Sequence, residues 1–109
     1  MDKLVEEICS TEEFYNLYLA EKKLEEREEL RKEVLLYERK ILEIEKADIS
    51  VIERKRQTET WRSKNSQMLK DRDVEKYLFA KSAFRNLRRK AIGYINRRID
   101  DNLEVLGLD

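Results

Sequence analysis

The sequence has no histidine, no proline, two glycines and one cysteine in 109 residues. Without proline, and with glycine only at Gly93 and Gly107, little in the chain can interrupt a helix. Without histidine it lacks the side chain whose ordinary pKa lies near neutrality, which excludes Ser-His-Asp and Cys-His catalysis and most zinc and haem sites. The composition therefore predicts an all-helical interaction protein that is not an enzyme.

Other absences bear on cofactors and location. The lone Cys9 cannot form an internal disulfide or a multi-thiolate metal site, and we expect it to act as a small apolar residue beside Ile8. Two isolated glycines cannot build a phosphate-binding loop. Residues 1–7 contain no signal-peptide region, and no window approaches the roughly 18 apolar residues that a membrane span needs. We expect a cytoplasmic protein with no cofactor, no metal and no membrane contact.

The residues that are present favour narrow helical seams. Charged residues make up 44 % of the chain and apolar residues 40 %, a balance typical of surface-charged helices packed along seams rather than around a thick core. The length suits a single helical domain over residues 1–109. Partner chains are expected to complete its core.

Charge is segregated although the net charge is zero. Residues 1–60 hold 12 Lys and Arg against 17 Asp and Glu, a net of −5, whereas residues 61–109 hold 12 against 7, a net of +5. One interpretation is that acidic N-terminal helices lie against the basic C-terminal helix, within one chain or across a dimer. The other is a surface for nucleic acid.

Helix boundaries are marked by capping residues. The capping-box spacing occurs twice, with Ser10 three residues before Glu13 and Ser50 three residues before Glu53. Each serine is predicted to cap a helix, the second one running towards Leu69. Like charges crowd residues 25–29, where we predict a turn or kink.

Two further boundaries lie later in the chain. The helix before Ser50 should end near residues 46–48. The last helix should run from about Arg72 to Leu106, capped by Asp71 or Asp73, and could reach roughly 50 Å. A helix of that length is longer than a small monomeric domain can cover, which favours self-association.

Apolar residues recur with helical spacing along two helices. Steps of 4, 3, 4 and 3 residues form a seam suited to packing against another helix, at Leu30, Val34, Tyr37, Ile41 and Ile44. One side of the last helix carries a second series that includes Phe84, Ile95 and Ile99. The expected fold is an all-α antiparallel bundle of three to five helices with a long C-terminal helix, completed by dimerisation.

Two further features are candidates for contact with a partner, namely Trp61 and a row of basic residues on the last helix. Trp61 is the only large apolar residue between Glu53 and Gln67, and it is either an interface anchor or packed under the last helix of its own chain. A basic strip on the last helix comprises Lys81, Arg85, Arg88 and Arg89, with Lys90 beside them. Its heads either meet carboxylates of the acidic helices or bind RNA phosphates.

Several stretches resemble the YlbF/YmcA family, which includes short YheA-like members. They are Glu-Glu-Phe-Tyr-Asn-Leu-Tyr-Leu-Ala over residues 12–20, Val-Leu-Leu-Tyr over 34–37, and Asp-Val-Glu-Lys-Tyr-Leu-Phe-Ala over 73–80, followed by spaced Leu87, Ile92, Ile95 and Ile99. The resemblance spans about residues 4–106. Unlike the regulator type, this sequence ends at Leu108-Asp109 without the cysteine-bearing tail associated with an iron–sulfur cluster.

The resemblance implies a helical protein that associates with itself or with related family members. It also implies a regulatory role in competence, sporulation and biofilm formation, linked to mRNA processing by the endoribonuclease RNase Y. The leading hypothesis is a homo-oligomeric adaptor, a dimer or higher assembly, that modulates a larger cytoplasmic machine through protein contacts. The alternative is an RNA-binding accessory protein that uses the basic strip.

Overall fold

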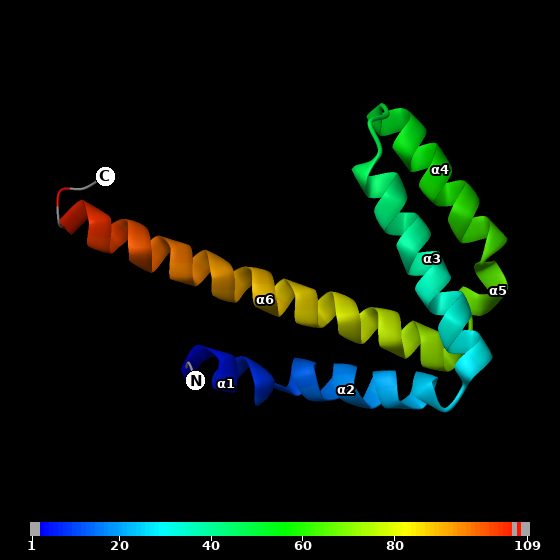
Figure 1. Ribbon diagram of the computed structural model, residues 1–109, viewed down its shortest axis with the longest axis horizontal. Coiled ribbons are helices and arrows are strands. Elements are labelled where there is room, and N and C mark those ends of the chain that lie inside the picture. Colours follow the sequence, from blue (N-terminus) through cyan, green and yellow to red (C-terminus); the bar gives the residue numbers. More distant parts are fainter. Residues whose placement is uncertain (1–2, 106, 108–109) are drawn as a thin grey trace. The chain divides into compact units, whose positions relative to one another are not determined.

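The protein is all-α, as the sequence predicts. The computed structural model describes residues 3–105 and 107, except for the side chains of Leu4 and of residues 102–105. Within these residues the elements are α1 (Lys3–Cys9), α2 (Glu12–Glu25), α3 (Glu28–Lys46), α4 (Val51–Lys64), α5 (Ser66–Leu69) and α6 (Arg72–Val105). The long C-terminal helix is confirmed at 34 residues, while the predicted boundary at Leu106 lies outside the described residues. The described helices number six rather than three to five, because α1 and α5 are short additional segments (Figure 1).

The chain divides into two compact units, which are described separately. One unit comprises residues 19–78, and the other comprises residues 1–18 together with 79–109. In the first unit, α3 and α4 lie side by side and run antiparallel, and α5 contacts both (Figure 1). In the second unit, α1 and the start of α2 accompany the later part of α6.

Most of the predicted helix boundaries are confirmed. The Ser50 hydroxyl accepts a hydrogen bond from the Glu53 N–H at 3.1 Å, which caps α4. The Asp71 carboxylate accepts from the N–H groups of Asp73 and Val74 at 2.9 and 3.3 Å and so caps α6. The crowded charges of residues 25–29 coincide with the break between α2 and α3, and α3 ends at Lys46.

The predicted cap at Ser10 is wrong by one residue. Its hydroxyl donates to the Glu7 carbonyl at 2.9 Å and completes the end of α1. Thr11 caps α2 instead, accepting from the Phe14 N–H at 3.3 Å. The predicted run from Ser50 to Leu69 is likewise interrupted at Asn65, between α4 and α5. Both corrections have one cause, the short helical segments that the periodicity did not separate.

Candidate interaction surfaces

The predicted seam on α3 forms the core of residues 19–78. Val34, Tyr37 and Ile44 are buried, and Leu30 and Ile41 are half-buried. Other buried side chains in this unit come from the other helices that build it: Leu24, Met68, Val74 and Tyr77. The seam therefore packs inside the single chain.

Trp61 packs on Tyr37 of α3. The two rings are stacked, with centroids 6.3 Å apart and 9° between their planes, and the indole N–H donates to the Tyr37 carbonyl at 3.2 Å. Neither interpretation of Trp61, an interface anchor or packing under the last helix, named this contact with α3. Trp61 is half-buried.

An ion-pair cluster joins the α2–α3 turn to the start of α6. Arg27 Nη2 lies 2.7 Å from Asp71 Oδ2 and Arg27 Nη1 lies 2.8 Å from Asp73 Oδ2. Hydrogen bonding by Arg27 lowers the pKa of the Asp71 carboxyl below its ordinary value. The same bonds, from Asp71 first and then Asp73, raise the pKa of Arg27. Asp71 thus both caps α6 and binds the turn.

This cluster predicts an acid-dependent loss of stability. Since the pKa of Asp71 is lowered on folding, its contribution is present above the ordinary aspartate pKa, about 4, and is lost as the pH falls below that value. The urea concentration at the unfolding midpoint should fall as the pH is lowered from about 5 to about 2.5. It should fall less steeply for Asp71→Asn than for the wild type. The control is Asp48→Asn, an exposed aspartate outside every ion pair among the described residues. Equal slopes for Asp71→Asn and the wild type would contradict the role of the cluster.

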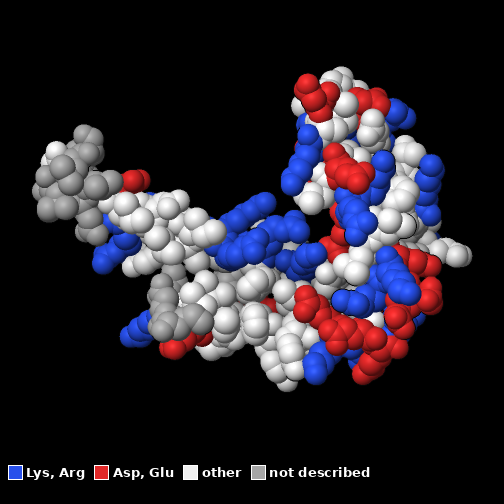
Figure 2. Space-filling model, in the orientation of Figure 1, with Lys and Arg blue, Asp and Glu red and all other residues white. Residues whose placement is uncertain are grey.

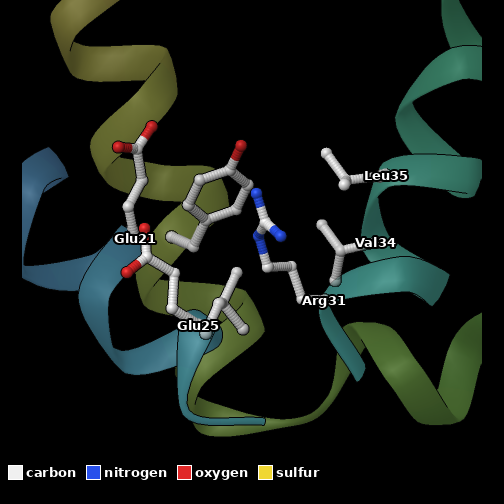
Figure 3. A pocket seen from close by; sticks show the side chains of 7 residues that line it. Glu21, Glu25, Arg31, Val34 and Leu35 are labelled. Carbon is white, nitrogen blue, oxygen red and sulfur yellow. The ribbon is translucent and has the colours of Figure 1, made fainter. Parts of the chain in front are cut away.

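A small pocket lies within residues 19–78. Its volume is about 160 Å³, below the roughly 300–1,000 Å³ typical of small-molecule sites. Figure 3 shows the Arg31 side chain between the glutamates of α2 and Val34 of α3. The lining residues are Glu21, Leu24, Glu25, Arg31, Val34, Leu35 and Tyr77.

The second unit has little buried surface of its own. Phe14 meets Phe84 edge to face with ring centroids 5.8 Å apart, which aligns α2 with α6. Phe84 and Ile95 are half-buried, whereas Ile99 is 50 % exposed. Cys9, expected to pack as a small apolar residue, is exposed. Several large apolar side chains are also exposed here, namely Val5, Tyr15, Tyr18, Ile92 and Tyr94.

The basic strip lies on α6, where Figure 2 shows Lys and Arg side chains gathered. Arg85, Arg88 and Arg89 are exposed, and Lys81 is half-buried. Within the described part of the chain, none of the three arginines forms an ion pair. The interpretation that Arg88 meets a carboxylate of its own chain is therefore not seen among these residues, and its guanidinium faces solvent.

Sequence reasoning missed three exposed apolar residues. Val51 and Ile52 are 78 % and 83 % exposed at the start of α4, and Phe79 is 77 % exposed on α6. The Ser50 cap could have indicated the first two, because it places them in the first helical turn beside the α3–α4 connection. Single exposed apolar residues are common on protein surfaces, so they gain weight only as groups.

Among the described residues, no group of three or more Cys, Asp or Glu side chains is placed to hold a metal ion. None of the described helices is both long and apolar enough to cross a membrane. The arrangement presents exposed apolar and basic helix faces.

These features define an all-α protein with exposed apolar and basic helix faces. The chain belongs to the family described as "Control of competence regulator ComK, YlbF/YmcA", which it matches over residues 1–103. This confirms the resemblance and fits a regulatory role. Neither the curated proteins nor the solved structures include a significant match.

Proposed function

We propose that this protein is a non-enzymatic, homo-oligomeric helical adaptor that regulates a larger cytoplasmic machine through protein contacts. One observation carries the proposal: eight described side chains are buried, and seven of them belong to residues 19–78. Only Ala80 represents the other unit. With one buried side chain among its described residues, this helical unit lacks a core that would hold it together in isolation.

A second copy would supply the missing core. An antiparallel pair of amphipathic helices buries one narrow stripe and leaves the flanks of both helices in water. In this unit the flanks carry aromatic and β-branched residues, with Tyr15 58 %, Ile92 51 % and Tyr94 56 % exposed. Two such pairs packed face to face make a four-helix arrangement in which these side chains meet. The partner copy thus completes a unit that is incomplete alone.

The regulatory half of the proposal rests on family membership. The family is described by control of a competence regulator, and the resemblance of the sequence implies a link to RNase Y-dependent mRNA processing. We extend this to a role as an accessory of an RNA-processing machine, alone or with related family members. Exposed residues on residues 19–78, such as Val51, Ile52 and Leu36, are free to contact it.

Sedimentation at micromolar concentration tests the assembly. We expect no predominant monomer for the wild type, and we expect Ile92→Glu combined with Ile99→Glu to give mainly monomer, because two carboxylates would enter an apolar contact. The matched control is Val51→Glu combined with Ile52→Glu, which alters two exposed apolar residues on the other unit and should leave the assembly intact. A wild type that is monomeric and melts cooperatively would overturn the proposal.

The adaptor role is tested separately by capture from a native extract, with and without nuclease. Partners held through apolar helix contacts should remain after nuclease treatment and should tolerate high salt. Loss of every partner after nuclease would show that the protein reaches its machine only through RNA.

A further inference from the structure

A long stretch of α6 contains basic residues but no acidic ones. Residues 76–99 contain eight Lys and Arg and no Asp or Glu, in a chain of zero net charge. They are Lys76, Lys81, Arg85, Arg88, Arg89, Lys90, Arg97 and Arg98. Since α6 is helical throughout, this segment extends roughly 36 Å at 1.5 Å per residue. Such a single-sign surface attracts an extended anion.

Four of these cations share one side of the helix. At about 100° per residue, Lys81, Arg85, Arg88 and Arg89 lie within a sector of roughly 100°. They span residues 81–89, which are eight residue steps or about 12 Å along the helix axis. A positively charged row of this kind can track the backbone of a single nucleic-acid strand.

The three arginines of this strip are available for binding. They are exposed and form no ion pair within the described part of the chain. Arg27 and Arg56 differ, because their guanidinium groups already bind carboxylates of their own unit. A guanidinium fork binds a phosphate through two parallel N–H donors, which makes arginine well suited to such a partner.

We infer that the strip of Lys81, Arg85, Arg88 and Arg89 on α6 is a binding surface for the phosphate backbone of single-stranded RNA. A flexible strand can follow a straight row of cations, whereas the phosphates of a duplex curve away around its grooves. Nothing in the strip reads base edges, so recognition is independent of sequence. This activity is additional to the adaptor role and does not require it.

The test measures the affinity of the full chain for a fluorescent single-stranded 20-mer of uridines at 50 and 200 mM salt. With three phosphates neutralised by the exposed arginines and a slope of about 0.7 per contact, wild-type binding should weaken roughly 20-fold between the two salt concentrations. Arg85→Gln combined with Arg88→Gln should weaken binding at 50 mM and reduce the salt slope by about 1.4. Thermal melts should be nearly unchanged because both side chains are exposed.

The control removes the same charge elsewhere. Arg62→Gln combined with Lys64→Gln alters two exposed cations of α4 and should keep most of the affinity and slope. If the two double variants lose the same RNA affinity, the binding depends on net charge alone and the inference is overturned. Absence of wild-type binding at 50 mM salt would also overturn it. So would equal or tighter binding of a 20-base-pair DNA duplex, or of polyglutamate, which would point to an acidic protein surface.

Discussion

Replacing Tyr37 with alanine is expected to lower the free energy of unfolding by about 3–5 kcal/mol, the usual cost of deleting a large buried ring. Tyr37 is only 7 % exposed and lies at the centre of the α3 seam. One face of its ring stacks on Trp61, so truncation would remove contacts on α3 and α4 together. Urea denaturation of the variant measures the loss.

Tyr37→Phe is the matched control, since it keeps the ring and its stacking. We expect a change below about 1 kcal/mol, because no hydrogen bond of the Tyr37 hydroxyl occurs among the described residues. A loss below about 1 kcal/mol for Tyr37→Ala itself would contradict the burial of the seam. Combining Tyr37→Ala with Trp61→Ala should cost less than the sum of the single changes, because both remove one contact.

Features that depend only on neighbouring residues in the chain could be predicted from the sequence. Ser50 and Asp71 cap helices because a hydroxyl or carboxylate one residue before a helix can accept from its first N–H groups, whatever the rest of the chain does. The same holds for the α3 seam, since a stripe of large apolar residues must be buried wherever a neighbour is available. Val34 at 1 % exposure illustrates this.

Features that depend on which helices become neighbours could not be predicted from the sequence. Periodicity shows that Trp61 needs a partner but does not identify it. Its contact with α3 depends on the path of the α3–α4 connection. The sequence likewise could not decide whether Arg88 meets a carboxylate of the acidic helices or faces outward. Arg88 is exposed and forms no ion pair among the described residues. Self-association and RNA binding remain predictions for the same reason: both concern molecules beyond the single chain.

Arg54 illustrates a contact that periodicity cannot predict, because it joins the end of one helix to the side chain of the next. A helix ends with carbonyls that have no partner within it. Near the end of α3 the Arg54 guanidinium donates to the carbonyls of Ala47 at 2.8 Å, Ile44 at 3.3 Å and Ile49 at 3.4 Å. The positive charge also lies where the dipole of α3 is negative. One side chain thus closes the α3–α4 connection.

Arg54→Leu is therefore expected to lower the free energy of unfolding by about 2–3 kcal/mol, since it removes three charge-assisted hydrogen bonds at the α3–α4 connection. Arg54→Lys should recover part of the loss, because an ammonium keeps the charge but cannot reach three carbonyls with a planar fork. Arg56→Leu should change stability much less, since the Arg56 side chain is 63 % exposed and its ion pair with Glu53 lies at the surface. Urea melts of the three variants decide the matter. If Arg54→Leu and Arg56→Leu give the same small change, Arg54 does not hold the connection and the turn is fixed by the Ser50 cap and the packing of α3 on α4 alone.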